Sequence, residues 1–147
     1  MQRCFSRRLG WVEFSAESVV EFPEGLPAFE DETQFILIER PETSPILFLQ
    51  SLKTAGLCFL SVPVEVVDSR YEFTLDSEQE NRLGTASRQD LLCLALLTVP
   101  DSGPPTANLK APIVIHRHLR KGYQVILNES PYSFTHPLGP ASEEVCS

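Results

Sequence analysis

The chain has 147 residues, of which 20 are Asp or Glu and 12 are Lys or Arg, giving a formal net charge of −8. This length fits one domain that buries roughly two-thirds of the surface of the unfolded chain, so no disulfide is needed to stabilise it. Direct binding to RNA or DNA is disfavoured, because affinity for phosphate chains comes mostly from Lys and Arg.

Neither a membrane span nor a secretion signal is expected. The longest apolar run, Leu91 to Val99, is about half of the roughly 20 residues that a spanning helix needs. The first residues, MQRCFSRR, are basic, but no apolar segment of a signal peptide follows them. The four cysteines are far apart and form no C-x-x-C motif, which favours free thiols in a reducing compartment. We therefore expect a cytoplasmic protein.

Short β-rich runs between turns that contain Pro and Gly predict the strands of an all-β protein. In chain order these strands are Gly10–Phe14, Ser18–Phe22, Gln34–Glu39, Ile46–Leu52, Leu57–Val62, Tyr71–Leu75, Leu91–Val99, Leu109–His118 and Tyr123–Asn128. The twelve prolines argue against long helices, because a proline inside a helix costs about 3 kcal/mol. We expect a small antiparallel barrel-like fold with one or two short helices, and a sandwich is the alternative.

One short helix is predicted near residues 77–84. Ser77 followed by Glu80 is a capping-box pattern, and Gly84 can end the helix after two turns. A second short helix can begin at Ser87 or Asp90, although the β-rich run that follows competes with it.

Residues 106–127 contain no acid but carry four bases and two of the three histidines. The pattern predicts a hairpin whose four-residue loop is 119–122, with Gly122 at a positive φ. The resulting antiparallel register pairs His118 with Tyr123, His116 with Val125, and Val114 with Leu127, all on one face of the sheet. The bases gather there partly because a loop tip is solvated.

Residues 9–39 are the most acidic part of the chain and contain no Lys or Arg. The acids are Glu13, Glu17, Glu21, Glu24, Glu30, Asp31, Glu32 and Glu39. One interpretation is a solvated surface that keeps the protein soluble. The other is an electronegative face that attracts basic proteins and repels nucleic acid.

His116 and His118 would share a face of one strand, so both could ligate a metal ion. No third ligand lies nearby in the sequence, and no H-E-x-x-H motif completes a site. Nucleophile signatures such as G-x-S-x-G are absent too, as is a glycine-rich phosphate loop. We expect no enzyme, no cofactor and no metal. The alternative is a small β-barrel enzyme or metal-binding protein that uses these two histidines.

Phe22, Phe29, Phe48 and Phe59 are expected in the core, as most phenylalanines are. Phe29 also has a second interpretation, because the segment FPEGLPAFED places it beside a double-proline turn and next to acids. An exposed aromatic ring surrounded by charges is typical of a protein-binding patch.

Seven segments follow one another in a recognisable order. They are FPEGLPAFED, SPILFLQSL, CFLSVPVEVVDSRYEF, LLTVP, PTANLKAPIVIH, GYQVIL and SPYSFTHPL. This order resembles the flagellar assembly factor FliW family over residues 9–138, which we expect to form a single β-barrel domain. We expect a flexible basic leader at residues 1–8 and a flexible acidic tail at residues 139–147. The chain departs from the family pattern at His116, where the family has Asn, and at Phe48, where it usually has Trp.

The resemblance implies a small cytoplasmic binding protein, a monomer without catalytic activity that binds neither nucleic acid nor membranes directly. Proteins of this family bind newly made flagellin, and they also bind the translational repressor CsrA. When flagellin is exported, the freed protein sequesters CsrA and lifts its repression of flagellin mRNA. A structural component of the flagellum is a further alternative. The acids between Glu13 and Glu39 would disfavour RNA near bound CsrA, through repulsion that reaches about 8 Å at physiological salt.

Partner contacts are expected at eight residues of these segments. They are Glu24, Phe29, Glu30, Phe48, Gln50, Asn108, Lys110 and Pro112. Asn108 has a second interpretation, because its side chain can cap a turn or bridge two strands.

Overall fold

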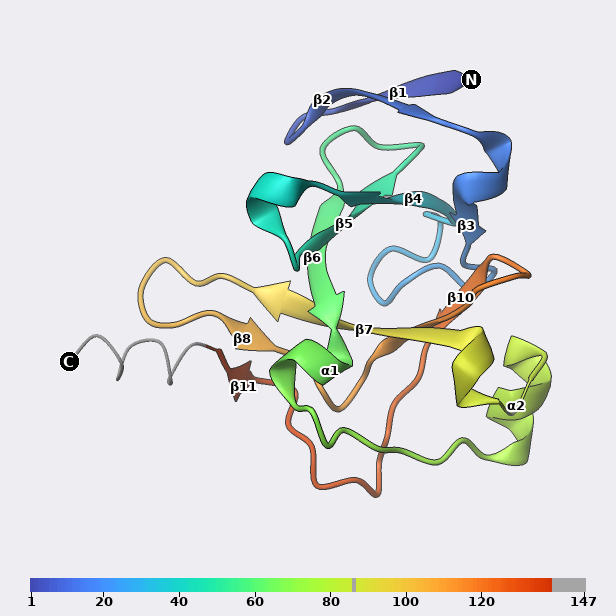
Figure 1. Ribbon diagram of the computed structural model, residues 1–147, viewed down its shortest axis with the longest axis vertical. Coiled ribbons are helices and arrows are strands. Elements are labelled where there is room, and N and C mark those ends of the chain that lie inside the picture. The colour runs from blue at the N-terminus through green and yellow to red at the C-terminus, as the bar shows by residue number, and fades with distance from the viewer. Residues whose placement is uncertain (86, 139–147) are drawn as a thin grey trace.

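The protein is described by a computed structural model for residues 1–85 and 87–138, which form a closed barrel of seven strands (Figure 1). These strands are β3 (Val19–Glu21), β4 (Gln34–Glu39), β5 (Leu47–Ser51), β6 (Cys58–Pro63), β7 (Leu91–Thr98), β9 (Ile113–His116) and β10 (Lys121–Gln124). Around the barrel the order is β7-β6-β5-β4-β3-β10-β9, and β9 pairs with β7 to close it. The predicted all-β, barrel-like fold is confirmed, and the sandwich alternative is wrong.

The junction between β3 and β10 is parallel, whereas the other six junctions of the barrel are antiparallel as predicted. A single register pair, Glu21 with Lys121, joins these two strands. The Glu21 N–H also donates to the Arg120 carbonyl at 2.8 Å, and Arg120 Nη2 donates to the Ser18 carbonyl at 2.9 Å. Parallel pairing between strands far apart in the sequence carries no local signal, so the prediction of a purely antiparallel barrel missed it.

Four further strands lie outside the barrel. β1 (Gln2–Ser6) and β2 (Gly10–Phe14) form a separate antiparallel hairpin at the top of Figure 1. β8 (Thr106–Ala107) and β11 (His136–Pro137) extend the sheet beside β7. The expectation of a flexible leader at residues 1–8 is corrected, because residues 2–6 pair with β2 over five positions. The expected flexible tail, residues 139–147, lies outside the described residues.

Alternation of side chains along the strands divides the apolar residues into one core inside the barrel and two outside it. The inner core contains Val20, Phe22, Leu26, Phe35, Leu49, Leu94, Ile113 and Ile115. The β1–β2 hairpin covers one outer core, which contains Val12, Phe14, Ile36, Ile38 and Phe48. The other outer core includes Val64, Tyr71, Leu83, Val114, Tyr123, Val125 and Leu127. The barrel wall is therefore buried on both sides over much of its circumference.

Two α-helices are present in the described residues. α2 (Ser77–Leu83) confirms the predicted helix, and Gly84 ends it at φ +84° as expected. Its capping box begins one residue earlier than predicted, because Asp76 accepts the Gln79 N–H at 2.8 Å and Gln79 Oε1 accepts the Asp76 N–H. The second predicted helix is a single 3-10 turn, Arg88–Asp90, that follows Ser87. α1 (Val64–Val67) was not predicted.

Two other short 3-10 turns connect strands. They are Ala16–Ser18, which precedes β3, and Pro41–Thr43, which joins β4 to β5.

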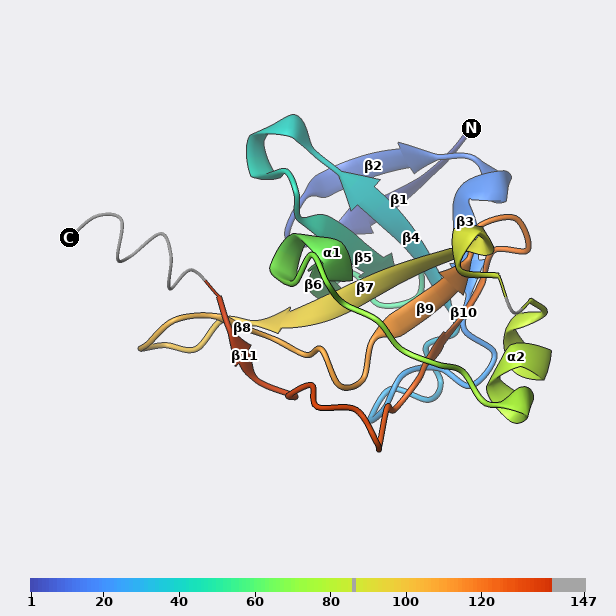
Figure 2. The ribbon, with the colours of Figure 1, turned by 60° about the horizontal axis from the view of Figure 1, so that its bottom comes forward.

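The segment Tyr71–Leu75, which was predicted as a strand, has no strand partner among the described residues. It links α1 to α2 and crosses the lower side of the barrel in Figures 1 and 2. Tyr71 fixes it there, because its hydroxyl donates to the Leu109 carbonyl at 2.6 Å and its ring stacks on Tyr132 with centroids 4.3 Å apart. The β-rich composition of this segment thus reflects burial of Tyr71 and partial burial of Phe73 and Leu75.

The hairpin of β9 and β10 has a different register from the predicted one. Its loop is Arg117–Arg120, with Arg120 at φ +57°, and the pairs are His116 with Lys121, Ile115 with Gly122, Val114 with Tyr123, and Ile113 with Gln124. The predicted loop at residues 119–122 is wrong, because Gly122 lies inside β10. The predicted shared face of Val114 and Tyr123 is confirmed, since both lie in an outer core, and Ile113 and Ile115 lie inside the barrel.

Candidate functional site

The eight expected contact residues lie in three separate parts of the fold. Glu24, Phe29 and Glu30 belong to the loop between β3 and β4, residues 22–33. Phe48 and Gln50 lie on β5, and Asn108, Lys110 and Pro112 lie in the segment that leads from β8 into β9. The structure brings only Glu24 and Glu30 into one hollow, of about 220 Å³, together with Tyr123 and Ile126.

The loop 22–33 is a compact series of turns anchored by a buried leucine. The Gly25 N–H donates to the Phe22 carbonyl, the Phe29 N–H donates to the Leu26 carbonyl, and Leu26 is buried in the inner core. Phe29 leaves 39% of its surface exposed and packs its edge against Phe59 at a centroid distance of 5.7 Å. The loop therefore presents Phe29 to solvent together with exposed acids, as the protein-binding interpretation of this segment requires.

Phe48 and Gln50 are both buried, so neither offers a side-chain contact to a partner in this conformation. Phe48 lies in the outer core beneath the β1–β2 hairpin, as the core interpretation of this residue predicted. Gln50 Nε2 donates to the carbonyls of Ser51, Thr54 and Ala55 at 3.0–3.3 Å and so braces the turn between β5 and β6. Both side chains therefore serve the fold in this conformation.

The segment before β9 is also held by local contacts. Asn108 Oδ1 accepts the Ala111 N–H at 2.9 Å, which is the turn-capping interpretation of this residue. Pro112 is buried, and its carbonyl accepts the Val125 N–H. Lys110 is partly exposed and places Nζ 5.9 Å from the ring centroid of Phe134, whose side chain is exposed. Of these three residues, only Pro112 is fully buried.

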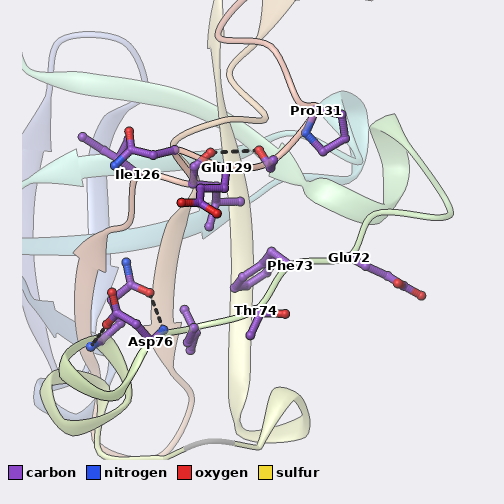
Figure 3. Close-up of a pocket in the computed structure, with 12 residues that line it drawn as sticks. Glu72, Phe73, Thr74, Asp76, Ile126, Glu129 and Pro131 are labelled. Atoms are coloured by element: carbon purple, nitrogen blue, oxygen red, sulfur yellow. Dashed lines mark hydrogen bonds between the residues drawn. The ribbon is translucent and has the colours of Figure 1, made fainter.

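A second and larger hollow, of about 630 Å³, was not predicted from the sequence. It is a groove between residues 72–76, which lead into α2, and residues 126–131, which follow β10 (Figure 3). Three acids line it, Glu72, Asp76 and Glu129, and no Lys or Arg does. The volume is within the range of about 300–1,000 Å³ that ligand sites occupy.

The groove and the smaller hollow form one acidic surface, because Ile126 lines both. Ile126 leaves half of its surface exposed between them. Arg82 lies near the smaller hollow, and it pairs with Glu24 at 3.6 Å and Glu78 at 3.1 Å. These pairs are largely solvent-exposed and therefore weak, so they leave the surface open to a competing cation from a partner. We call this surface, from Glu24 and Glu30 to Glu72 and Glu129, the acidic groove region.

The imidazole of His116 is part of the hairpin loop, whereas the side chain of His118 is exposed. His116 is buried, and its Nδ1 accepts the N–H groups of His118 and Leu119 at 3.1 Å each. This lone pair is therefore used by the backbone. No group of three His, Cys, Asp or Glu side chains that could hold a metal ion occurs within residues 1–85 and 87–138.

The described cysteines are free thiols, as predicted: Cys4, Cys58 and Cys93. Cys146 lies beyond the described part of the chain. Burial raises the pKa of Cys93 to about 11, despite Arg88 Nη1 at 3.0 Å from its sulfur. Because the thiolate is the reactive form, Cys93 is a weak nucleophile at neutral pH.

Glu32 differs from the other loop acids because it holds the loop to the barrel. Its carboxylate accepts the hydroxyls of Ser51 and Thr54, and these hydrogen bonds lower the pKa of Glu32. A lowered folded-state pKa stabilises the protein above the unfolded pKa of about 4.3, and this contribution is lost as the pH falls through the folded-state value.

Glu32→Gln is therefore expected to lower the free energy of unfolding at pH 7 by about 1 kcal/mol. The difference from the wild type should shrink as the pH falls through the lowered folded-state pKa of Glu32, because the wild-type carboxylate is then protonated. Urea unfolding at a series of pH values measures this. Glu17→Gln is the control, since Glu17 is exposed and accepts no side-chain hydrogen bond from a described residue. A pH-independent difference would contradict the assignment.

None of the helices in the described parts of the chain has the length and apolar character needed to cross a membrane.

The fold and its surface define a class, that of small closed β-barrels whose outer faces are covered by a hairpin and by long connecting segments. A sequence model of the family described as "FliW protein" matches residues 3–138. The flagellar assembly factor FliW of Syntrophomonas wolfei is 39% identical over 134 residues, covering 90% of this chain and 86% of that protein. The FliW of Bacillus pumilus is 38% identical over 134 residues, covering 90% and 93%.

A crystal structure of the flagellar assembly factor FliW has the same fold. It superimposes with a TM-score of 0.86 at 35% sequence identity, covering 95% of this chain and 99% of that one. The chain belongs to the FliW family. The resemblance stated from the sequence is thereby confirmed, and the match from residue 3 includes β1 within the family's fold.

Proposed function

We propose that this chain is a cytoplasmic regulatory binding protein of flagellar assembly. It binds flagellin, and when flagellin is exported the released protein binds CsrA, antagonises it, and so relieves repression of flagellin mRNA. Its relatives are named as flagellar assembly factors, which supports the flagellar role. The two partners are those that the family resemblance implies. The protein acts by binding other polypeptides and carries out no reaction on them.

The observation that carries the CsrA part of the proposal is the acidic groove region. Glu24, Glu30, Glu72 and Glu129 are all exposed and lie around two adjoining hollows. A protein that binds RNA needs a basic surface, because Lys and Arg supply most of the affinity for phosphates. An acidic surface that docks on such a protein attracts it and disfavours RNA within about 8 Å at physiological salt.

The charge of the chain also supports a polypeptide partner over nucleic acid. The net charge is −8, and one of the two arginines of the β9–β10 loop has a structural role. Arg120 holds the closure of the barrel, where burial lowers the pKa of its guanidinium. The acid-free stretch of residues 106–127 thus supplies β9, β10 and the loop between them, and one of its four bases is used in the closure of the barrel.

Reversing two acids of the smaller hollow tests the proposal. The double variant Glu24→Lys/Glu30→Lys is expected to weaken CsrA binding about tenfold, since each charge contributes up to about 1 kcal/mol at an exposed interface. The control Glu42→Lys/Asp101→Lys changes the net charge equally at two exposed acids away from both hollows. Titration calorimetry measures affinity, and a competition assay measures RNA release from CsrA.

The same titrations separate the two parts of the proposal. Binding of the wild-type protein to flagellin and to CsrA, each measured alone and then in competition, is the expected result. Equal affinity of both double variants for CsrA would contradict the role of the acidic groove region. A wild-type protein that binds neither partner would overturn the proposed function as a whole.

A further inference from the structure

The main chain along the groove carries unused hydrogen-bonding groups. The N–H groups of Phe73, Thr74 and Leu75 donate to no described residue, although the segment has the composition of a strand. On the opposite wall, the neighbours of Ile126 donate to carbonyls of the preceding segment, Val125 to Pro112 and Leu127 to Lys110. The N–H and carbonyl of Ile126 itself have no partner in residues 1–85 and 87–138.

We infer that the groove binds an extended, basic segment of a partner polypeptide, which lies between residues 72–76 and 126–131 and pairs with their free main-chain groups. The inference deepens the proposed function, on which it rests, by assigning how a basic partner is held. Adding an extended peptide to unpaired main-chain groups is a recurrent mode of recognition, in which main-chain hydrogen bonds give affinity and alternate side chains give specificity.

The negative charge of the groove favours a basic segment of the partner. Glu72 and Glu129 are exposed, lie on opposite walls, and form no ion pair with a described residue. Asp76 adds a third negative charge, although its Oδ1 also caps α2. With no Lys or Arg in the lining, Lys or Arg side chains of the bound segment would have carboxylates on both walls.

The apolar part of the groove lining favours apolar residues at every second position of the bound segment. Ile126 is half exposed, and Phe73 is half-buried against the outer core (Figure 3). Successive side chains of an extended chain point to opposite sides. A segment that alternates basic and apolar residues can therefore place its apolar side chains against Ile126 and Phe73 while its basic side chains reach the carboxylates.

The probe is a hexapeptide of alternating Lys and Val, titrated into the wild-type protein by calorimetry and by NMR chemical-shift mapping. Binding is expected, with shifts confined to residues 72–79 and 126–131. Methylating the peptide's amide nitrogens removes its donors and keeps its charge, so we expect affinity to fall at least tenfold. Equal binding of the methylated peptide, no binding of the parent peptide, or shifts mapping elsewhere would overturn the inference.

Two protein variants test the walls separately. Glu72→Lys/Glu129→Lys is expected to weaken binding of the hexapeptide at least tenfold, whereas Glu42→Lys/Asp101→Lys, with the same change in net charge, should weaken it less than threefold. Thr74→Pro removes one unbonded N–H at an exposed position, and a similar tenfold loss is expected. Unchanged affinity in both groove variants would contradict the inference.

The outcomes distinguish this inference from the proposed function. If the groove variants bind CsrA and flagellin normally and the hexapeptide does not bind, the mode of recognition is wrong and the proposed function stands. If the hexapeptide binds in the groove while neither protein binds, the groove is a peptide site and the proposed function is wrong.

Discussion

Gly122→Ala is expected to lower the free energy of unfolding by about 2–3 kcal/mol, because it overfills the inside of the barrel. A Cβ atom at this position would lie 2.6 Å from Cε2 of Phe22 and 3.0 Å from Cγ1 of Ile115. Phe22 is fully buried and packs its ring edge-on against Phe35 at 5.4 Å, so it has little room to move. Urea unfolding followed by circular dichroism measures the effect.

Gly56→Ala is the matched control for this change. The three atoms nearest to its Cβ would all belong to the flexible side chain of Arg7, at 3.4–3.6 Å, which is ordinary van der Waals contact. We expect a change within about 0.5 kcal/mol. Phe22→Leu in the Gly122→Ala background should recover part of the lost stability, since it shortens the side chain that the new methyl group meets. A Gly122→Ala protein as stable as the wild type would show that the barrel closes differently.

Gly25→Ala is expected to cost about 3 kcal/mol and to change the shape of loop 22–33. Gly25 has φ +66°, which costs an L-residue about 1–2 kcal/mol. Its Cβ would also lie 2.5 Å from Cα and O of Glu30, which are backbone atoms, so the loop must open to admit it. The neighbouring Glu24 would then move relative to Glu30, and CsrA affinity should fall along with stability.

Gly10→Ala separates the cost of the positive φ from the cost of the steric contact with Glu30. Gly10 has φ +82°, but a Cβ atom added there would have no other atom within 4 Å, so only the backbone cost of about 1 kcal/mol is expected. CsrA affinity should be unchanged, because Gly10 lies in the β1–β2 hairpin. Equal losses of stability in the two variants would mean that the contact between Gly25 and Glu30 does not constrain the loop.

Much of the barrel could be predicted from local sequence, because alternating apolar residues between turns mark its strands. The predicted strand Gln34–Glu39 coincides with β4, and Leu91–Val99 overshoots β7 by one residue. Pairing between strands that are far apart in the sequence was harder to predict. The parallel closure of β3 with β10 depends on where the chain returns after roughly 100 residues, and no local pattern encodes this.

Two errors have a shared physical cause, which is that composition does not report tertiary contacts. The leader at residues 1–8 is basic, yet it forms β1 because the face that carries Cys4 packs on the outer core. Gly122 was assigned to a turn because glycine favours turns, yet it lies in β10 because Phe22 leaves no room for a side chain. In both cases, packing against distant residues overrides the local preference.

The candidate site was predictable only where a single segment forms it. Glu24, Phe29 and Glu30 could be found because one loop carries an aromatic ring among acids. Phe48 and Gln50 are buried in the fold, and the burial of Gln50 could not be predicted from the segment alone. The groove is built from residues 72–79 and 126–131, which lie about 50 residues apart, so no motif announces it.

The short junction of β3 with β10 lies beside the acidic groove region, so binding of a partner there can affect the stability of the barrel. Loop 22–33 follows β3, and residues 123–126 belong to β10 and the chain just after it, so the smaller hollow, which both segments line, spans the junction that a single register pair holds. The groove adjoins it on the β10 side, through Ile126. A polypeptide bound in both hollows at once would connect the segments that follow β3 and β10 and so stabilise this junction. Binding of such a polypeptide and folding of the barrel would then be thermodynamically linked. A partner present at one hundred times its Kd would raise the free energy of unfolding by about 2.7 kcal/mol.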